Sequence, residues 1–384
     1  MRKTKPIALA VSAMLLFALT GCESTSTSSI PTISITESNG ESSNAESSGG
    51  ESSAVSTAEQ STASSTPVST TSTTSEESTS QPVTPDNEHG GELSGNVIVD
   101  ATGRGMPIFG GGSGTVYAQA VNAVKEKVGN QVNVFSMIVP TQGSFYMPEG
   151  FYMASEWDCI QNVNDQLYGI IPVDAYSALA AHVDEEIYAR TDHHWMQLGA
   201  YYAAEKFVKT ALIDVPFTPL SDYERIDIEG YLGSLYGYSN ENATMRKNPE
   251  TFTYYKAPND YATYYMNPQD TDFMQATMFP TMDVSNSYST FMGGDMKVVH
   301  VETDVENRRK LLIIKDSYPN AMVPCLTGSF EDIWTVDMRY LEVMEHFPHS
   351  ISQIVKDQGI TDVLFCMDSF SAVGENANHL PGIV

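Results

Sequence analysis

Leu311-Leu312-Ile313-Ile314-Lys315-Asp316-Ser317 is the run that most strongly indicates how this chain folds. Its four leading apolar residues predict a buried β-strand, which ends where the polar residues begin. Pro319 follows shortly after Ser317, and proline is favoured in the first turn of a helix. The run therefore predicts a strand, a tight turn at Ser317 and a helix. In doubly wound sheets, ligands bind at the carboxyl ends of such strands.

Apolar runs and amphipathic segments alternate on both sides of this run. Further strands are predicted at 97–99, 107–109, 132–139, 296–301, 333–336 and 363–367, and helices at 115–128, from about 195 to 211, at 320–326 and at 340–356. Strands that alternate with helices indicate an α/β fold with a mostly parallel sheet covered on both faces. Residues 216–294 depart from this pattern, because they are rich in tyrosine and asparagine. They predict an irregular, hairpin-rich insertion.

The N-terminal part of the chain has the features of an exported, anchored protein. Residues 1–21 combine a basic start with an apolar stretch that is shorter than the ~20 residues needed to span a bilayer, which is typical of a signal peptide. Leu19-Thr20-Gly21-Cys22 resembles a bacterial lipobox, which implies lipidation at Cys22. The alternative is an ordinary secretory signal in which Cys22 has no role. Either reading places the mature protein outside the cytoplasm.

Residues 22–92 are rich in Ser and Thr and carry hardly any large apolar side chains. Such a segment cannot bury enough surface to offset its ordering entropy, so we expect a disordered tether with a typical end-to-end distance of roughly 45 Å. The remaining residues, 93–384, are long enough for one large α/β domain with the insertion at about 216–294. The sequence therefore predicts a domain held away from a membrane.

Charge and cysteine content exclude several classes of function. The chain has 20 Lys and Arg against 48 Asp and Glu, a formal net charge of −28. Such a surface repels nucleic acid and anionic membranes, because phosphate binding needs clustered Lys and Arg. Besides Cys22 the chain has Cys159, Cys325 and Cys366, so at most one internal disulfide can form, and buried thiols are expected at Cys325 and Cys366. No spacing indicates a structural zinc site.

A second reactive run, Arg190-Thr191-Asp192-His193-His194-Trp195, lies where a helix is predicted to begin. Residues two apart point in different directions within a helix, so Asp192 and His194 can cooperate only at its entry, where Thr191 or Asp192 is expected to cap it. An acid beside an imidazole fixes its tautomer and stabilises the imidazolium that forms when it takes a serine proton. Together with Ser317 the two residues are the parts of a serine-type acyl-transfer site.

Other interpretations of these residues remain open. Histidines beside a carboxylate also bind metals, and further imidazoles are available at His182, His300, His346, His349 and His379. The letters Asp-His-His also occur in the DHH phosphoesterases, but the preceding aspartate motifs of those proteins are absent. Ser369 is another serine at a strand end, although no comparable helix is predicted after it. Ser113 lies in a glycine run without the spacing of a nucleophile elbow.

The runs Arg190 to Trp195 and Lys315-Asp316-Ser317-Tyr318 resemble those of the DHHW proteins of bacterial envelopes. These look related to the SGNH-hydrolase-like proteins that acetylate alginate and similar exopolysaccharides. The similarity covers most of residues 95–384, including Val139-Pro140-Thr141 and Phe291-Met292-Gly293-Gly294. It implies an SGNH-like three-layer fold. The order Asp, His, Ser departs from ordinary SGNH hydrolases, whose serine comes first, and agrees with the alginate-type branch.

The resemblance also implies roles for individual residues. Ser317 is the implied nucleophile, His194 the base and Asp192 the orienting acid. No oxyanion asparagine can be placed from the motifs, so a backbone N–H of Gly293 or Gly294 is the candidate second donor. His193 is expected to be structural or to contact substrate, and Trp195 either lines the pocket or belongs to the core.

The sequence thus predicts a lipid-anchored, extracytoplasmic O-acetyltransferase or acetylesterase that needs no cofactor or metal. Its expected partners are an extracellular polysaccharide or cell-wall glycan and a membrane protein that donates acyl groups. The alternative is an envelope lipoprotein that binds glycan without catalysing a reaction.

Overall fold

The computed structural model describes residues 90–214 and 216–384. The predicted signal peptide, Cys22 and nearly all of the predicted tether lie outside these residues. All the described residues belong to one compact unit. Within them no helix combines the length and apolar character needed to cross a membrane.

The main sheet has eight strands in the order β5-β4-β13-β11-β12-β10-β8-β9. In chain order the strands are β4 (Asn133–Val139), β5 (Ile171–Pro172), β8 (Tyr261–Met266), β9 (Met274–Ala276), β10 (Val298–Thr303), β11 (Lys310–Lys315), β12 (Asp332–Asp337) and β13 (Asp362–Asp368). The strands from β5 to β12 pair in parallel, whereas β10, β8 and β9 add antiparallel ladders. The fold is therefore α/β as predicted, but the sheet is mixed rather than mostly parallel.

The antiparallel part of the sheet explains this difference. β8 and β9 come from the tyrosine-rich region 216–294, and β8 joins the sheet by pairing with β10 from Val298↔Met266 to Thr303↔Tyr261. Antiparallel strands need no crossover helix, so this part of the sheet lacks the strand-helix alternation on which the prediction rested.

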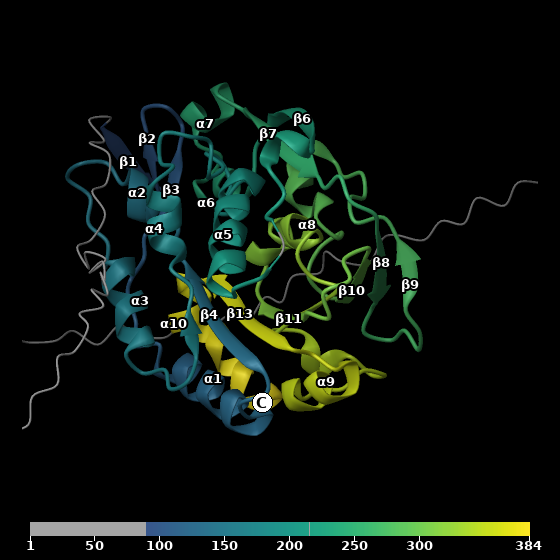
Figure 1. Ribbon diagram of the computed structural model, residues 1–384. Helices are drawn as coiled ribbons and strands as arrows, with labels where there is room; N and C mark the ends of the chain where they lie inside the picture. Colours follow the sequence, from purple (N-terminus) through teal and green to yellow (C-terminus); the bar gives the residue numbers. More distant parts are fainter. Residues whose placement is uncertain (1–89, 215) are drawn as a thin grey trace, which may run out of the picture. The chain divides into compact units, whose positions relative to one another are not determined.

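Helices cover both faces of the parallel strands. Figure 1 shows α1 (Thr115–Val128) and α9 (Ile351–Gln358) on one side of β4 and β13, and α4 (Ala175–Ala180) and α5 (Gln197–Thr210) on the other. Neighbouring residues of β4 contact the two layers. Phe135 packs edge-on against Phe207 of α5, and Ser136 Oγ lies 2.8 Å from the Tyr117 hydroxyl of α1. Successive strand residues point to opposite faces, so β4 is buried on both sides.

The remaining elements lie outside the main sheet. A three-stranded sheet is formed by β1 (Gly91–Ser94), β2 (Val97–Asp100) and β3 (Gly105–Pro107), and β6 (Glu224–Tyr231) pairs with β7 (Glu250–Lys256). The other helices and 3-10 turns are α2 (Gly143–Tyr146), α3 (Glu156–Asn164), η1 (Leu220–Asp222), α6 (Ser234–Tyr238), α7 (Ala243–Lys247), η2 (Val284–Thr290), η3 (Tyr318–Ala321), α8 (Val323–Leu326), η4 (Leu341–Val343), α10 (Ser369–Val373), η5 (Glu375–His379) and α11 (Leu380–Ile383).

One predicted helix has the observed bounds, and two others begin later than predicted. The helix predicted at 115–128 is α1, with the same bounds. The helix after Trp195 begins only at Gln197, and its N-cap Met196 makes no side-chain cap, so the capping role predicted for Thr191 and Asp192 is wrong. The α-helix predicted at 340–356 begins only at Ile351 and ends two residues later than predicted, as α9 (Ile351–Gln358). Thr191 and Asp192 instead lie in an irregular turn before α5, and their side chains are available for other contacts.

Candidate active site

Ser317 lies at the carboxyl end of β11, as the sequence predicts, and is the first residue of the turn into η3. Asp316, the residue before it, connects two neighbouring strand ends. Its Oδ1 accepts a hydrogen bond from the Tyr318 N–H at 2.9 Å, and its Oδ2 accepts one from the Asp368 N–H at 2.9 Å. Both bonds are buried, so the backbone around Ser317 is held on both sides.

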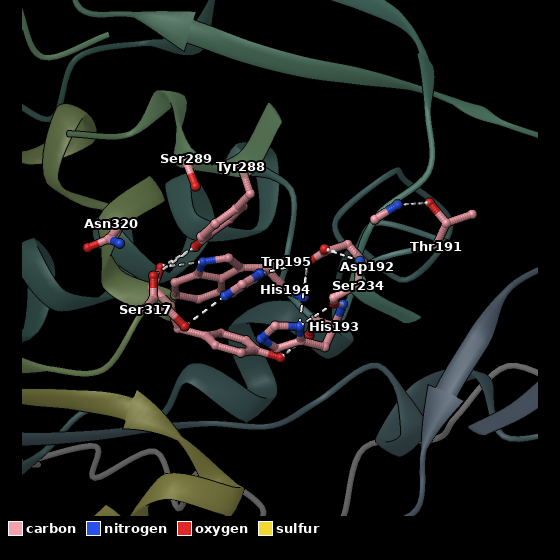
Figure 2. A network of polar contacts seen from close by, with 12 residues as sticks. Thr191, Asp192, His193, His194, Trp195, Ser234, Tyr288, Ser289, Ser317 and Asn320 are labelled. Atoms are coloured by element: carbon pink, nitrogen blue, oxygen red, sulfur yellow. Dashed lines mark hydrogen bonds and ion pairs between the residues drawn. The ribbon is translucent and has the colours of Figure 1, made fainter. Parts of the chain in front are cut away.

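The structure brings Ser317, His194 and Asp192 together (Figure 2). His194 Nε2 lies 2.7 Å from Ser317 Oγ, and His194 Nδ1 lies 2.6 Å from Asp192 Oδ1. The His194 N–H also donates to Asp192 Oδ1 at 3.0 Å. Asp192 and His194 are both buried, at 5% and 7% exposure. An acid, an imidazole and a hydroxyl in one hydrogen-bonded line have the geometry that serine-type acyl transfer needs.

The second carboxylate oxygen of Asp192 is held by the turn that precedes α6. Oδ2 accepts a hydrogen bond from the Ser234 N–H at 2.8 Å. The residue before it must be glycine, since a Cβ at Gly233 would lie 2.4 Å from both Asp192 Cβ and Oδ2. Burial acts to raise the pKa of Asp192, but the charge and hydrogen bond of His194 outweigh it, so this pKa lies well below its usual value. The carboxylate is therefore held ionised beside the imidazole.

Tyr288 of η2 covers one face of His194. The two rings are stacked, with centroids 3.7 Å apart and planes 6° apart. The Tyr288 hydroxyl donates to the carbonyl oxygens of Ser317, at 3.1 Å, and Tyr318, at 2.8 Å. Burial holds the pKa of Tyr288 well above its usual value, so the hydroxyl stays protonated. One side chain from the tyrosine-rich region thus fixes both the imidazole and the serine turn.

Glu250 of β7 anchors the backbone just before Asp192. Its carboxylate accepts hydrogen bonds from the N–H groups of Arg190 and Thr191, both at 2.7 Å, and from the Thr191 hydroxyl. Thr191 Oγ1 in turn accepts a hydrogen bond from the Gly233 N–H at 3.0 Å. Burial raises the pKa of Glu250. The turn that carries Asp192 and His194 is therefore built jointly by β7 and the segment before α6.

His193 and Trp195 flank His194 but have different surroundings. His193 lies 2.5 Å from Ser234 Oγ through Nδ1, and a third of its side chain is exposed in the cavity. Burial and the charge of His194 lower the pKa of His193 to about 4. Trp195 is fully buried and does not line the cavity, and its indole N–H donates to the Tyr318 carbonyl at 2.8 Å. Trp195 therefore belongs to the core beneath the serine turn.

The two predicted oxyanion glycines are not equivalent. The N–H of Gly293 donates to the Ser289 carbonyl at 3.0 Å, so it is already used within the chain. Gly294 lines the cavity, and within residues 90–214 and 216–384 no acceptor is assigned to its N–H. Asn320, which is not among the residues proposed from the sequence, also lines the cavity. Its Nδ2 donates to Asp295 Oδ1 at 2.8 Å, which leaves a second N–H on the same nitrogen.

The two other serines considered from the sequence are occupied elsewhere. Ser369 is fully buried, and its hydroxyl donates to Glu156 Oε2. The expectation that no helix follows Ser369 is wrong, because α10 begins there. Ser113 Oγ accepts a hydrogen bond from the Thr115 N–H at 3.3 Å.

All three cysteines among the described residues are free. Cys325 and Cys366 are buried thiols, as predicted, and burial raises the pKa of both. Cys159 is partly exposed.

A cavity of about 570 Å³ opens over the Ser317 hydroxyl. Its lining is mostly polar and includes Ser234, Asn286, Asp295 and Arg339. One ligand atom from each of Asp192, His193 and His194 lies within 4.8 Å of the others, a spacing that suits a metal ion. Both ring nitrogens of His194 are, however, already within hydrogen-bond distance of Asp192 and Ser317. The arrangement as it stands therefore fits proton transfer better than metal binding.

Glu250, Gly233, Ser234, Tyr288 and Asn320 were not found from the sequence. The first four contact residues 190–194 from the region 231–294, far along the chain from Asp192, so no local spacing reveals them. Asn320 alone had a signal, since it lies three residues after the serine on the turn that the run at 311–317 predicts.

Comparisons with known proteins agree on the family. The family model for DHHW proteins matches residues 108–336, which include Asp192, His194 and Ser317. A DHHW family protein from Eubacterium siraeum, known from a crystal structure, is 44% identical, with a TM-score of 0.71 over 77% of this chain and 97% of that one. No curated protein matches the sequence significantly.

More distant structures share the fold. PatB1 of Bacillus cereus, solved with a sulfonyl adduct, is 17% identical, with a TM-score of 0.61 over 77% of this chain and 99% of that one. A second structure of PatB1 has a TM-score of 0.58, again at 17% identity, over 75% of this chain and 99% of that one. On the strength of the family model and the 44% identical structure, this chain belongs to the DHHW family.

Proposed function

We propose that this protein is a serine-dependent O-acyltransferase or acetylesterase that acts on an extracellular polysaccharide or cell-wall glycan. The observation that carries the proposal is the line of hydrogen bonds from Asp192 through His194 to Ser317, at 2.6 and 2.7 Å. Each of the three side chains has the partner that its proposed role requires, and the serine faces a cavity rather than the core.

The proposed reaction has two halves. With its Nδ1–H donated to Asp192, His194 accepts the Ser317 proton at Nε2 while Oγ attacks the carbonyl carbon of an acyl ester. The C–O bond of the ester breaks, and the proton passes from Nε2 to the leaving alkoxide. A sugar hydroxyl or water then loses its proton to Nε2 and attacks the acyl-enzyme, and Ser317 leaves with that proton. The ionised Asp192 stabilises the imidazolium in both halves.

Three donors at the cavity are suited to the negative oxygen of the tetrahedral intermediates. They are the backbone N–H groups of Ser317 and Gly294 and the free N–H of Asn320 Nδ2. Because Asp295 holds the Asn320 amide in place, this donor is oriented before the reaction begins. Loss of one such donor typically lowers kcat by about 10²–10³-fold.

The fold and the N-terminal sequence support the rest of the proposal. Helical layers on both faces of the parallel strands support an SGNH-like three-layer domain at 93–384. Residues 216–294 contribute to it the turn that holds the Asp192 carboxylate. The lipobox-like run ending at Cys22 supports a lipid anchor outside the cytoplasm, with 22–92 as the tether. A membrane protein that delivers acyl groups would then lie within reach of the site.

The decisive experiment is covalent labelling of the purified protein with an arylsulfonyl fluoride. We choose this reagent because the distant fold relative PatB1 was solved with a sulfonyl adduct. We expect one sulfonyl group per chain, located on Ser317 by mass spectrometry, and no label on Ser317→Ala. A folded wild type that takes no label but still binds glycan would contradict the proposal and favour the non-catalytic alternative.

A chelator tests the competing metal interpretation. Labelling and ester hydrolysis should survive exhaustive dialysis against EDTA, because the proposed proton transfers use only side chains of the chain. Loss of hydrolysis that added Zn²⁺ or Mn²⁺ restores would assign Asp192, His193 and His194 to a metal instead.

A further inference from the structure

A second cavity, of about 450 Å³, adjoins the catalytic one. The two share His193 and Tyr238 in their linings, so one wall separates them. Each falls within the range of about 300–1,000 Å³ that is usual for small-molecule sites. We call the two neighbouring cavities together the groove; the proposed reaction at Ser317 has no use for the second of them.

Besides Tyr318 and His193, the second cavity is lined mostly by residues that do not belong to the Ser317 site. Val97 of β2 and Pro107 of β3 come from the small N-terminal sheet, and Leu235 comes from α6. Phe370 of α10 also lines the cavity, and its ring packs edge-on against the buried Phe109, with centroids 5.2 Å apart. Three separate parts of the fold therefore converge on a space that the catalytic residues do not need.

Large apolar side chains are left exposed around this cavity. Tyr238 is 59% exposed, Ile108 41% and Phe370 37%. Apolar surface gathered at one pocket, rather than scattered over the molecule, indicates a binding site. Asn96, Thr141 and Asp368 add polar groups to the same lining. Aromatic rings combined with a few polar groups suit a pyranose, which has an apolar C–H face and a rim of hydroxyls. Thr141 already donates to Glu156, and Asp368 already accepts from the Ser371 N–H. A purely apolar acyl chain would, however, cover the exposed Asn96 side chain without pairing it.

The charges along the groove indicate which sugars fit. Among the described residues that line the two cavities, Arg339 is the sole Lys or Arg side chain. Its guanidinium is already paired with Asp337, at 2.6 Å, and with Asp295, at 2.9 Å. Burial and the charge of Asp316 hold the pKa of Asp368 well above its usual value, and a carboxyl group offers no positive charge to an anion in either protonation state. No cation is left to pair with the carboxylate of a uronic acid, and the chain as a whole has a net charge of −28.

From these observations we propose that the groove binds a neutral glycan chain, with one sugar unit over Ser317 and the next against Tyr238 and Phe370. The inference rests on the proposed function for the acceptor chemistry, but the binding it describes does not depend on turnover. It makes chain length and charge of the acceptor, rather than the single sugar that is modified, the basis of selectivity.

Binding to the full-length Ser317→Ala protein tests the proposal without catalysis. Isothermal titration with neutral chito- and cello-oligosaccharides, from monomer to hexamer, should show affinity that rises at least about tenfold with length and then levels off, a gain of roughly 1.4 kcal/mol. Oligomannuronates of the same lengths should bind more weakly. Failure of every neutral series to bind, affinity that does not depend on length, or equal binding of the anionic series would overturn the proposal.

Two variants in the same background locate the second unit. Phe370 lines only the second cavity, so Phe370→Ala should lower hexamer affinity about fivefold, the effect of losing one aromatic contact, and leave monomer affinity unchanged. Tyr238 lines both cavities, so Tyr238→Ala should weaken both ligands. The matched control Tyr168→Ala removes a ring that is 74% exposed in a different cavity and should change neither.

The outcomes separate this proposal from the proposed function. Because Phe370 also packs against Phe109, Tyr238→Ala is the decisive variant if Phe370→Ala melts at a lower temperature. Hexamer affinity that Tyr238→Ala leaves intact contradicts the groove. Length-dependent binding combined with a wild type that takes no sulfonyl label would support the glycan-binding groove and contradict the proposed enzymatic activity. Labelling of Ser317 without length-dependent binding would do the reverse.

Discussion

Two neighbouring strands of the sheet end in nearly the same sequence. β11 runs into Asp316-Ser317-Tyr318, and β13 runs into Asp368-Ser369-Phe370. Both serines begin a helical turn, and the two aspartates are joined by the hydrogen bond from the Asp368 N–H to Asp316. Yet Ser317 meets His194 at a cavity, whereas Ser369 meets Glu156 in the core.

The comparison separates the contribution of the strand-to-helix turn from that of the residue that contacts each serine hydroxyl. The strand-to-helix turn orients a serine at the edge of a parallel sheet in both cases. The segment that packs against the turn decides whether the hydroxyl meets an imidazole at a cavity, as at Ser317, or a carboxyl in the core, as at Ser369. For Ser317 that segment is the turn before α5, held by Glu250 and Gly233. For Ser369 it is α3, whose first residue is Glu156.

Exchanging each serine for alanine should have the largest effect. Ser317→Ala should lower kcat for 4-nitrophenyl acetate by at least about 10³-fold, because the nucleophile is lost. Ser369→Ala should stay within about tenfold of wild type but lose about 1–3 kcal/mol in urea unfolding, because buried Glu156 loses a donor. The comparison fails if Ser369→Ala stops turnover and Ser317→Ala does not.

Removing the partner above Ser317 should be nearly as damaging. Asp192→Ala and His194→Ala should each abolish hydrolysis of acetyl esters to within detection, a loss of about 10³-fold or more, since the base loses either its orientation or itself. His193→Ala should retain much of the activity, because His193 contacts Ser234 rather than Ser317. A larger loss in His193→Ala than in His194→Ala would mean that the base is misassigned.

A milder test displaces the Asp192 carboxylate without replacing the residue. Gly233→Ala places a Cβ 2.4 Å from Asp192 and should lower kcat by roughly 10²-fold, the usual cost of displacing a catalytic group by about 1 Å. Gly237→Ala is the matched control on the same short segment, because a Cβ there meets nothing within 4 Å. Equal rates for both variants would show that the position of Asp192 is not set by this turn.

The smallest expected effect is on the pH dependence of stability. The pKa of His193 is about 4 in the folded protein and ~6.5 in an unfolded chain, so the unfolded state binds more protons between these values. The free energy of unfolding should therefore rise with pH across this window. His193→Gln should flatten that slope in urea titrations at several pH values, and an unchanged slope would assign the pH dependence to other groups.

Local patterns predicted the parts of the site that one segment forms. Four apolar residues and a proline identified the turn at Ser317, and the Asp-x-His spacing identified the pair that meets it. The apolar spacing of 115–128 gave α1 with its observed bounds. In each case the residues that decide the structure are close together in the sequence.

Pairing between distant segments was not predictable in this way. β8 and β9 alternate too weakly to be distinguished from loops, because pairing with their neighbours in the sheet, not their own sequence, makes them strands. Glu250 appears in the sequence as one of many acids and becomes an anchor only when β7 lies beside Thr191. The helix predicted after Trp195 begins later because Asp192 binds His194 and Ser234 instead of capping it.

The stacking of Tyr288 on His194 has a consequence for the order in which the two substrates bind. The ring centroid of Tyr288 lies 3.7 Å from that of His194, and the ring centroid of His193 lies 3.8 Å from it. The imidazole of His194 therefore cannot flip between the two half-reactions. In the proposed reaction every proton therefore enters and leaves through the single edge that carries Nε2. The departing alcohol of the donor and the incoming hydroxyl of the acceptor must visit the same place, one after the other. Excess acceptor should then compete with the donor for the free enzyme and slow the first half-reaction.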